Sequence, residues 1–557
     1  MKDSRGAPPA SRLGPAVLPL AIAAAAFVAF LPSFWGQFLD FDDKANLVDN
    51  TAFRGLGLGQ LRWMFTAYHM GLYIPATWLT FGADYLLWGL DPRGFHLTNL
   101  LLHAANAALV YVVALRLYRR AAAGAEGTPW SWGAGLAALL FALHPLRVES
   151  VAWITERRDV LSACLLLLAT LAYLEHAERE PRASGSMGPW YWLSLGAYGV
   201  SLLAKAMAMT FPAVLLLLDL YPLRRGLRWR EKLPFAALAF FAAANTYWGL
   251  RGAEKTAVLG SYDALQSAAF CLYGAAFYLW KSLLPFGLSP LYEAPLRLDP
   301  WQPAYLASAA LVAGLTGLAW AWRGRRPAFS AAWAYYLIAI SPVVGVVRNG
   351  PQIVADRYSY LPCLSWAILA GAAAALWLRD RGEAGRRLAL AAAACLAVVL
   401  GSATWRQCAV WRSSADLWTR VLSLNPGSHT AHNNLANHLW AKGKTDEAEE
   451  HYRQALEAQP LYAPSLTNLG GMLLMKGRRT EAMDFLRRSL RLKPGQPEAR
   501  NNLGVALLGQ GRPMEAALEF AEALRIRPGW KPAQDNLRAA LLTANARGRV
   551  SARVNLR

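Results

Sequence analysis

A 34-residue period near the end of the chain constrains its fold more than any other feature. A proline recurs at that spacing, as does an Asn-Leu pair and, three times, a glycine. The positions are Pro426, Pro460, Pro494 and Pro528; Asn434-Leu435, Asn468-Leu469, Asn502-Leu503 and Asn536-Leu537; and Gly443, Gly477 and Gly511. Three registers that share one period indicate a single supersecondary unit copied in series. The sequence therefore predicts stacked helical hairpins that form an α-solenoid.

A period of 34 residues, with glycine at the turn and proline at the end, is typical of tetratricopeptide repeats. We expect a repeat domain over residues 405–543 and a disordered basic tail over residues 544–557. The predicted units of the domain are a half repeat (411–426), three full repeats (427–460, 461–494 and 495–528) and a capping helix (531–543).

Each repeat carries an asparagine at the same point of its first helix, on what should be the concave face. These residues are Asn434, Asn468, Asn502 and Asn536. Amide side chains in that position can bind an extended acceptor peptide without regard to its sequence. The alternative is that they cap or pair the helices of the array itself.

The rest of the chain has the composition of a membrane protein. Hydrophobic residues make up 55% of the 557 residues, 23 residues are tryptophan, and the mean hydropathy is +0.21. The formal net charge of +21 does not indicate nucleic-acid binding, because much of it lies in short loops between apolar segments. The five cysteines show no paired or metal-site spacing. We expect a multi-span membrane domain over residues 1–404.

Hydropathy and charge predict how this domain crosses the bilayer. A basic N-terminus followed by the apolar stretch 13–34 indicates a first span that starts in the cytoplasm. If residues 265–284 cross the bilayer fully, the basic cluster 323–326 lies on the outer side, against the positive-inside rule. If they are re-entrant or pair with a second short crossing, this cluster lies in the cytoplasm and the domain has about eleven spans. The last span, 388–404, then exits on the extracytoplasmic side with the repeats. The predicted cytoplasmic clusters are 116–120, 178–182, 224–232, 323–326 and 379–387.

The predicted first outer loop, residues 35–95, carries two adjacent acids, Asp42 and Asp43. Adjacent carboxylates repel each other, so one can have a raised pKa and accept a proton from a hydroxyl nucleophile, or the pair can hold a cation or a sugar. A solvated loop with a helix-capping aspartate is the structural alternative. Within the same loop, proline, aspartate and dense aromatic residues make 73–90 more typical of an interfacial helix than of a span.

Charged residues also stand in apolar surroundings in three further segments: 144–163, 190–220 and 346–362. Charges at membrane depth are costly unless they pair or meet a ligand, and arginines at the bilayer edge suit a lipid phosphate. Mutual ion pairing, or snorkelling of the lysine to the interface, is the alternative. The residues are His144, Arg147, Glu149, Glu156, Arg157, Arg158, Asp159, Lys205, Arg348, Asp356, Arg357 and Tyr358.

Several segments together resemble one known family. They are FDD (41–43), residues 74–111, HPLRVESVAWITERRDVLSA (144–163), LLAKAMAMTFPAVLLLLDLYPLRR (202–225) and ADRYSYLP (355–362). With the repeats that follow, they resemble the transmembrane and tetratricopeptide-repeat protein O-mannosyltransferase family and its bacterial relatives, which are polyprenyl-phosphate-sugar-dependent glycosyltransferases. The resemblance implies an all-α protein, with a polytopic GT-C-like transmembrane helix bundle followed by an extracytoplasmic tetratricopeptide-repeat α-solenoid.

The resemblance also implies roles for individual residues. The catalytic base would be an acid of the first outer loop, Asp42 or Asp43. The implied ligands of the donor phosphate are Arg157, Arg158, Lys205 and Arg357. The implied supporting residues are His144, Glu149, Asp159, Asp356 and Tyr358. Neither a metal nor a cofactor is implied beyond the lipid-linked sugar donor. Relatives often have arginine where this chain has Ile74, and an acid or proline where it has Ala206, which affects the acceptor pocket and sugar identity more than the fold.

The predicted function is transfer of a sugar, mannose or similar, from polyprenyl phosphate to a protein Ser/Thr hydroxyl or a glycan, with the repeats binding the acceptor. The alternative is a membrane-anchored interaction scaffold without catalysis. The expected location is the inner (cytoplasmic) membrane of a bacterium, with the repeats on the periplasmic side.

Overall fold

The computed structural model describes residues 16–122, 128–179, 187–252, 262–345 and 350–554. The basic residues at the start of the chain and Arg348 therefore lie outside the described residues. The chain divides into two compact units, Met1–Asp416 and Leu417–Arg557. The division falls later than residue 404, because the helix α15 (Glu383–Val410) is longer than the predicted last span.

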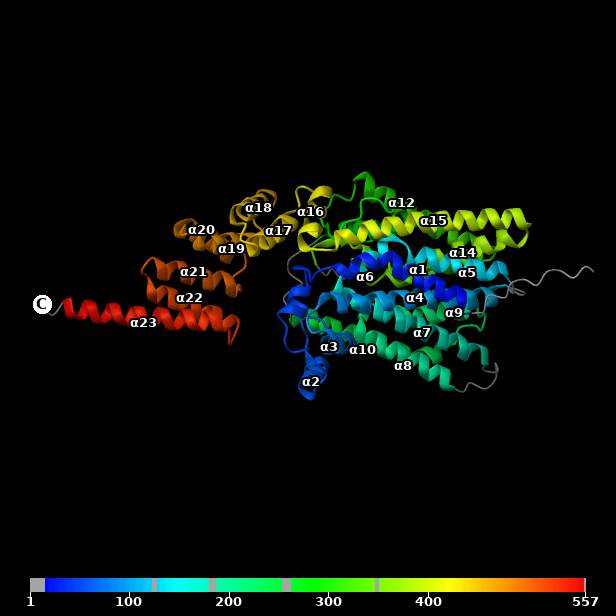
Figure 1. Cartoon of the computed structure of the whole chain (residues 1–557), viewed down its shortest axis with the longest axis horizontal. Helices are drawn as coiled ribbons and strands as arrows, with labels where there is room; N and C mark the ends of the chain where they lie inside the picture. Colours follow the sequence, from blue (N-terminus) through cyan, green and yellow to red (C-terminus); the bar gives the residue numbers. More distant parts are fainter. Residues whose placement is uncertain (1–15, 123–127, 180–186, 253–261, 346–349, 555–557) are drawn as a thin grey trace, which may run out of the picture. The chain divides into compact units, whose positions relative to one another are not determined.

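The first unit is a bundle of helices with a two-stranded antiparallel sheet, in which Tyr292 lies opposite Val354 (Figure 1). Its α-helices are α1 (Val17–Phe30), α2 (Leu58–Thr66), α3 (Pro75–Trp88), α4 (Pro92–Ala121), α5 (Thr128–Ala142), α6 (Val148–Ala152), α7 (Arg157–Arg179), α8 (Pro189–Ala204), α9 (Phe211–Leu220), α10 (Trp229–Gly252), α11 (Ala264–Leu283), α12 (Pro303–Trp322), α13 (Pro327–Ile340), α14 (Leu364–Arg379) and α15. Its short helical turns and strands are η1 (Leu31–Trp35), η2 (Lys44–Val48), η3 (Pro145–Arg147), η4 (Ile154–Glu156), η5 (Ala206–Thr210), η7 (Asp356–Ser359), β1 (Tyr292–Glu293) and β2 (Gln352–Val354).

The apolar helices of this unit include candidates for membrane spans. Among the described residues, five helices are long and apolar enough to cross a bilayer, or six if the bent pair of Thr128–Ala142 and Pro145–Ala152 forms one span. Three shorter apolar helices accompany them: Ala206–Leu220, Pro327–Ile340 and Leu364–Arg379. Neither α3 nor α11 is among these helices. The total of about eleven spans stays a prediction.

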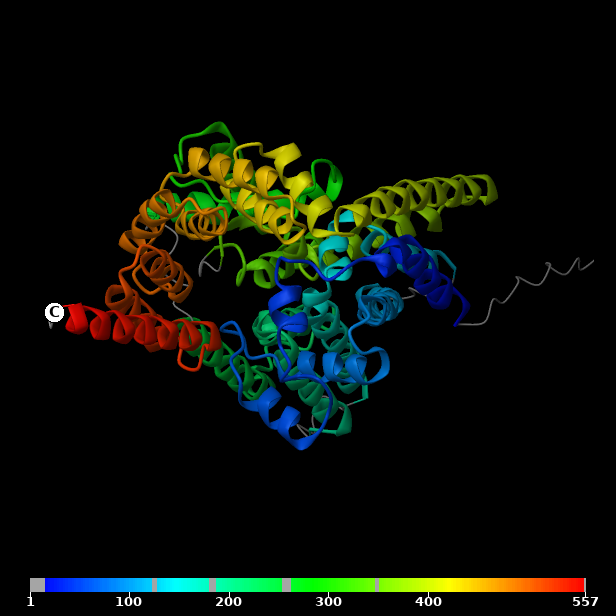
Figure 2. The same cartoon turned by 60° about the vertical axis from the view of Figure 1, so that its left-hand side comes forward.

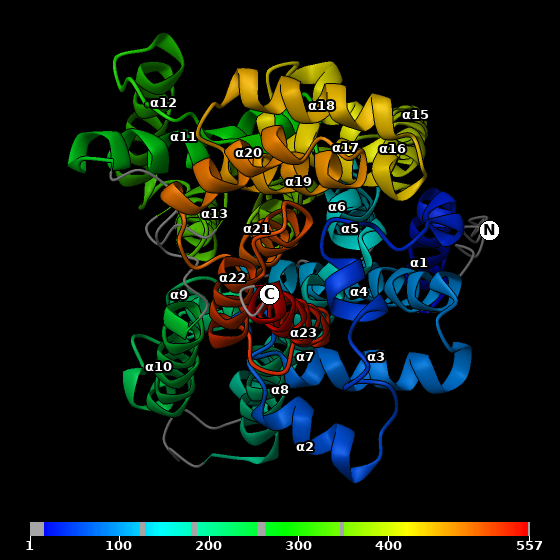
Figure 3. The ribbon, with the colours of Figure 1, turned by 90° about the vertical axis from the view of Figure 1, so that its left-hand side faces the viewer.

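The helix α4 lies at the centre of the bundle and packs against α1, α3, α5 and α7 (Figure 3). One face of α4 carries a buried polar stripe at heptad-like spacing, Asn99, His103 and Asn106. Asn99 Nδ2 donates to the carbonyl oxygens of Val151 and Trp153 at 3.2 and 3.4 Å, and His103 Nε2 contacts the carbonyl oxygen of Ala142 at 3.0 Å.

These carbonyls lie where the chain between α5 and α7 breaks into short helices. A broken helix leaves backbone groups without intrahelical partners, and lipid cannot supply new ones. The polar stripe supplies them from within the protein. It thereby holds the irregular segment 143–156, which carries Glu149 and Glu156, at a fixed place on the bundle.

The helices α5 and α14 approach each other closely at two glycines. A Cβ atom on Gly133 would lie 2.4 Å from the carbonyl oxygen of Gly371, and one on Gly371 would lie 2.2 Å from that of Gly133. Both distances are shorter than any non-bonded contact that a Cβ atom makes in proteins. The backbones can meet here only because neither residue has a side chain, as at other small-residue helix contacts in membrane proteins.

The second unit is a series of antiparallel helical hairpins (Figure 2). Its helices, beginning with one that starts at the unit boundary, are α16 (Ser414–Leu424), α17 (His429–Ala441), α18 (Thr445–Ala458), α19 (Ala463–Met475), α20 (Arg479–Leu492), α21 (Pro497–Gly509), α22 (Pro513–Ile526) and α23 (Lys531–Val554). The pairs α17/α18, α19/α20 and α21/α22 lie within the three predicted repeats.

The glycines of the 34-residue period lie at the turns inside these hairpins. Gly443, Gly477 and Gly511 have φ angles of 78°, 77° and 81°, a conformation that favours glycine. The last helix, α23, continues past residue 543 through most of the segment predicted to be disordered, and residues 555–557 lie outside the described residues. Alanine and arginine, both strong helix formers, make up six of the eleven residues 544–554, which favours the extension.

Candidate functional site

The two adjacent aspartates after the first helix have different surroundings. Asp43 is fully buried, and its carboxylate accepts hydrogen bonds from the backbone N–H of Leu39 at 3.1 Å and from the N–H and hydroxyl of Thr155 at 2.9 and 2.5 Å. Burial raises the pKa of Asp43 from 3.8 to about 7, against the lowering effect of these hydrogen bonds. Asp43 thus fastens the loop to the segment before α7.

Asp42 is only half-buried. Its carboxylate lies near enough to the guanidinium of Arg158 for their charges to interact. The hydrogen bonds of Asp43 to Thr155, three residues before Arg158, account for this proximity. The loop and the charged segment 144–163, far apart in the sequence, therefore meet at the Asp43–Thr155 contacts.

Three predicted cations converge on one carboxylate, that of Glu156 in η4. Arg158 binds Glu156 with two nitrogens, the Nε at 3.0 Å. Lys205 Nζ lies 3.1 Å from Glu156 Oε2, and Arg357 Nε lies 3.3 Å from Glu156 Oε1. Lys205 also pairs with Asp159, and Arg357 with Glu149. We call these six residues the ion cluster: Arg158, Lys205, Arg357, Glu149, Glu156 and Asp159.

The cations and the acids of the ion cluster differ in exposure. The side chains of Arg158, Lys205 and Arg357 are 14%, 16% and 11% exposed, whereas those of Glu156, Glu149 and Asp159 are 0%, 1% and 6% exposed. The acids therefore lie behind the cations. Each cation keeps a small exposed part of its side chain, while its partner acid fixes its position.

The segment around Arg357 is held from several sides. The backbone N–H of Arg357 donates to Glu149 Oε2 at 2.9 Å, and its guanidinium lies over the rings of Trp153 and Tyr358, at 5.5 and 4.8 Å from the centroids. Asp356 is buried and accepts a hydrogen bond from the Tyr292 hydroxyl at 2.9 Å; burial, together with the charge of Glu149, raises the pKa of Asp356. Tyr358 accepts from Gln352 Nε2 at 3.0 Å.

Arg157 is separated from its neighbour Arg158. The side chain of Arg157 is fully buried, pairs with Asp84 on α3, donates from Nε to Asn99 Oδ1 at 2.8 Å and donates to the carbonyl oxygen of Phe95. Every one of these partners belongs to α3 or α4. Arg157 therefore joins α7 to those helices inside the protein, and we do not include it among the candidate phosphate ligands.

His144 also serves the local fold. Its Nδ1 accepts a hydrogen bond from the N–H of Leu146 at 3.2 Å, which caps η3, and its Nε2 contacts the carbonyl oxygen of Ser282 at 3.1 Å. Both ring nitrogens are engaged by backbone groups, outside the ion cluster. The supporting role implied for His144 is thus one of holding η3 against the end of α11.

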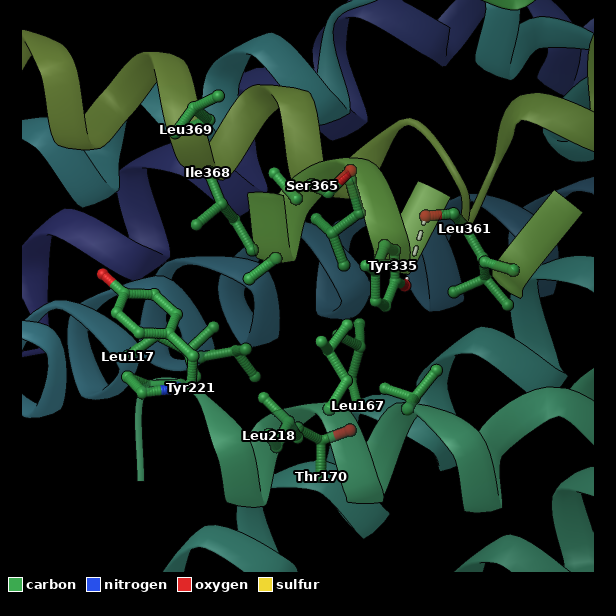
Figure 4. A pocket seen from close by; sticks show the side chains of 18 of the residues that line it. Leu117, Leu167, Thr170, Leu218, Tyr221, Tyr335, Leu361, Ser365, Ile368 and Leu369 are labelled. Atoms are coloured by element: carbon green, nitrogen blue, oxygen red, sulfur yellow. Dashed lines mark hydrogen bonds between the residues drawn. The ribbon is translucent and has the colours of Figure 1, made fainter. Parts of the chain in front are cut away.

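The first unit also contains an apolar groove. It is lined by residues of α4, α7, η5, α9, α13 and α14. Met207 and Leu361 line it close in sequence to Lys205 and Arg357, and Tyr118 and Tyr221 line it near the ends of α4 and α9. Figure 4 shows the side chains around this space, among them Leu117, Leu167, Leu218, Tyr335 and Leu369.

In the repeats, the asparagine side chains bond one hairpin to the next. Asn468 Nδ2 donates to Asn433 Oδ1 at 3.1 Å and to Asn437 Oδ1 at 3.0 Å, and Asn536 Nδ2 donates to Asn501 Oδ1 at 2.9 Å. Asn434 accepts from Asn433 at 3.3 Å, and Asn502 Nδ2 packs against Gly471. These amides therefore bind other residues of the repeat array, which was the alternative to acceptor binding. Their binding of an acceptor peptide stays a prediction.

Sequence reasoning assigned no role to three residues that organise this site. Glu156 holds the cations together, Thr155 holds Asp43, and Asp84 neutralises Arg157. Glu156 stands in the same charged run as the predicted residues, so its position was a usable signal. No such signal marks Thr155 or Asp84, because the residues that they bind are more than seventy positions away along the chain.

Two descriptions of tetratricopeptide repeats match the end of the chain. One matches residues 411–463 and 433–497, and the other matches residues 473–541. A solved tetratricopeptide-repeat protein of Thermus thermophilus is 21% identical and covers 29% of this chain and 96% of its own, with a TM-score of 0.22. The chain therefore belongs to the class of membrane proteins in which an apolar helix bundle is joined to a tetratricopeptide-repeat solenoid.

Curated relatives extend the similarity to the membrane unit. Protein O-mannosyl-transferase TMTC4 of Homo sapiens is 26% identical over 511 residues, which cover 80% of this chain and 66% of the human protein. Protein O-mannosyl-transferase Tmtc3 of Drosophila melanogaster is 26% identical over 456 residues, which cover 70% and 48%. The match spans about half to two thirds of these relatives. The chain is a homologue of the transmembrane and tetratricopeptide-repeat O-mannosyltransferases over most of its length.

Proposed function

We propose that this protein is a membrane glycosyltransferase that moves a sugar, mannose or similar, from a polyprenyl-phosphate donor to a Ser/Thr hydroxyl of a protein or to a glycan. The observation that carries the proposal is the set of three partly exposed cations around Glu156, with the half-buried Asp42 beside one of them. The similarity to proteins named O-mannosyl-transferases supports the class of reaction.

The donor would bind with its phosphate at the cations and its lipid in the apolar groove. Guanidinium and ammonium groups are the usual protein ligands of phosphate, and the side chains of Arg158, Lys205 and Arg357 are the partly exposed members of the ion cluster. Met207 and Leu361, which lie close in sequence to Lys205 and Arg357, line the groove, and its mostly apolar lining suits an isoprenoid chain. An amphiphile that spans both would have its sugar held near the Asp42 loop.

Asp42 is the better candidate for the base because it is half-buried, whereas Asp43 is fully buried. A general base must come within hydrogen-bond distance of the hydroxyl it deprotonates, and geometry decides this before pKa does. Asp43 is enclosed and already accepts three hydrogen bonds. Its role would be to hold the loop in place while Asp42 meets the acceptor.

The chemical step would be a single displacement at the anomeric carbon. The acceptor oxygen forms a bond to that carbon, the bond from the carbon to the phosphate oxygen breaks, and the electron pair leaves with the polyprenyl phosphate. The hydroxyl proton passes to the Asp42 carboxylate. The leaving phosphate gains one negative charge, which the three cations would stabilise by about 3 kcal/mol for each well-directed donor. The repeats would present the acceptor.

The test is sugar transfer by the full chain in lipid vesicles that contain polyprenyl-phosphate mannose, with a Ser/Thr-rich peptide as acceptor. Asp42→Asn should lower turnover by about 100-fold or more, because positioned general bases contribute at least that factor. Asp49→Asn is the matched control: Asp49 lies in the same loop, is 58% exposed and pairs with Lys44, so its loss should leave turnover within about twofold.

Wild-type turnover by Asp42→Asn would contradict the assignment of the base. A wild-type chain that folds, binds the acceptor peptide and transfers no sugar from this donor would instead support the scaffold alternative.

A further inference from the structure

The loop that carries the two aspartates is attached to a short segment just before the second unit. The backbone N–H of Gln37 donates to the carbonyl oxygen of Arg412 at 2.9 Å, and the N–H of Asp40 donates to Ser414 Oγ at 2.8 Å. Ser414 is 4% exposed, and the latter bond is partly buried. These two bonds lie on either side of Leu39, whose N–H binds Asp43.

The same segment contributes a buried indole to an aromatic stack. Trp411, which is 2% exposed, stacks on Trp153 with 5.7 Å between ring centroids, and Trp153 stacks on Phe41 at 4.7 Å. Phe41 is the residue before Asp42. Trp153 also lies under the guanidinium of Arg357. The stack therefore joins the segment to both parts of the candidate site, the acidic loop and the ion cluster.

This segment is also where the repeat similarity begins. The matched repeat region starts at residue 411, and Ser413 caps the first helix of the array by accepting from the N–H of Asp416 at 3.2 Å. Residues 411–414 therefore have two structural roles. They start the repeat array, and they supply the contacts that hold the loop of residues 37–43.

We propose that Trp411 and Ser414 are positioning residues that hold Asp42 in its working place, so that the base is anchored by the first residues of the repeat array. The inference rests on the proposed function for its effect on turnover, but the anchoring itself does not depend on any activity. Removal of either anchor should free the loop while Glu156 keeps its cations, because neither residue is a partner in the ion cluster.

Hydrogen exchange of the full chain in detergent tests the anchoring directly. Ser414→Ala should increase exchange at the Asp40 amide by about fivefold, the factor that loss of one hydrogen bond implies. Trp411→Ala should increase exchange over residues 37–43, and Trp411→Phe should restore most of the protection. Ser413→Ala is the matched control, because its hydroxyl bonds to Asp416 within the array and not to the loop.

The transfer assay then separates positioning from simple support of the fold. Ser414→Ala should lower kcat by about fivefold and leave the KM for the lipid donor unchanged, since the donor would bind at the ion cluster. Unchanged exchange in both Ser414→Ala and Trp411→Ala would overturn the inference, as would faster exchange with unchanged kcat. Absence of transfer by the wild type would count against the proposed function, and the exchange data would still decide the anchoring.

Discussion

Neighbouring residues at the site have opposite roles, and the difference lies in what each side chain faces. Arg157 and Arg158 are adjacent, yet one is fully buried against Asp84 and the other keeps an accessible edge beside Glu156. Successive residues of a helix point about 100° apart, so two adjacent arginines at the start of α7 meet different surroundings. Asp42 and Asp43 differ in the same way.

The pKa of Asp43 leads to a prediction for stability. Burial raises this pKa from 3.8 to about 7, so between these pH values the folded chain holds a proton that the unfolded chain has released. The free energy of unfolding should therefore fall as the pH rises from about 4 to about 7, by at most about 4 kcal/mol, and level off above. The unfolding temperature of Asp43→Asn in detergent, measured from pH 5 to 8, should lack this part of the wild-type slope.

The control is Asp49→Asn in the same loop, which should retain the wild-type slope because Asp49 is exposed. Parallel pH profiles for the wild type and Asp43→Asn would show that Asp43 does not titrate in this range.

At this scale, the sequence predicted which residue types gather but not their partners. The acids of the first loop, the run 144–163, Lys205 and Arg357 were all expected at one place, because charges in an apolar chain need partners or ligands. The assignment of Arg157 to the phosphate could not be refined from the sequence. Its partners Asp84 and Asn99 lie on other helices, and no local pattern connects them to it.

At the scale of helices, two features hold the bundle together. Polar side chains replace hydrogen bonds that are missing where a helix breaks, and glycines let two helices approach closely. Asn99 and His103 on α4 illustrate the first, since they bind carbonyl oxygens freed by the breaks around η3 and η4. Pro145 signals the break in the sequence, but nothing local shows that amides of α4 will satisfy it. The close approach of α5 and α14 illustrates the second.

Gly133→Ala should destabilise the protein, because its new Cβ atom would lie 2.4 Å from the carbonyl oxygen of Gly371 and force the two helices apart. We expect a cost of about 1–3 kcal/mol, typical of overpacking. Thermal unfolding in detergent measures it. Gly314→Ala on α12 is the control, because no atom lies within 4 Å of its Cβ position, and alanine favours a helix over glycine. Equal unfolding temperatures for the two variants would contradict the close packing of α5 against α14.

At the scale of the whole molecule, the repeats were the most predictable part and the membrane crossings the least. Each repeat buries its residues against the next copy of the same pattern, so one 34-residue period determines both hairpins and turns. Membrane helices do not repeat, and several here are short or bent, so hydropathy alone does not count them. The length of α23 was also underestimated, because a basic tail can still be a good helix former.

The charge distribution predicts the orientation of the bundle. Arg116 at the end of α4 pairs with Glu175 and Glu178 near the end of α7, at 2.7 and 2.9 Å, whereas the starts of α4 and α7 lie at the Asp42 loop and the ion cluster. The bundle thus has a basic end and a site end. By the positive-inside rule we predict that the basic end lies in the cytoplasm and that the site end, with residues 411–414, lies on the opposite side.

Cysteine labelling across α15 tests this orientation. The helix has 28 residues, long enough at about 1.5 Å per residue to cross a bilayer. In a chain with Cys395 replaced by serine, Arg387→Cys should react with a membrane-impermeant maleimide only from the cytoplasmic side. Arg412→Cys should react only from the opposite side; both positions are exposed. Labelling of both from one side would contradict the proposed location of the repeats.

The ion cluster pairs three basic side chains with three acidic ones, so their formal charges cancel before any donor arrives. In the proposed reaction the spent carrier would leave with one more negative charge than the donor brought, so a pocket of unpaired arginines and lysines would bind it more strongly than the fresh donor. The carboxylates behind the cations would oppose such product inhibition. The same neutrality that keeps the empty site stable in an apolar setting would thus let the used lipid depart and the next one enter.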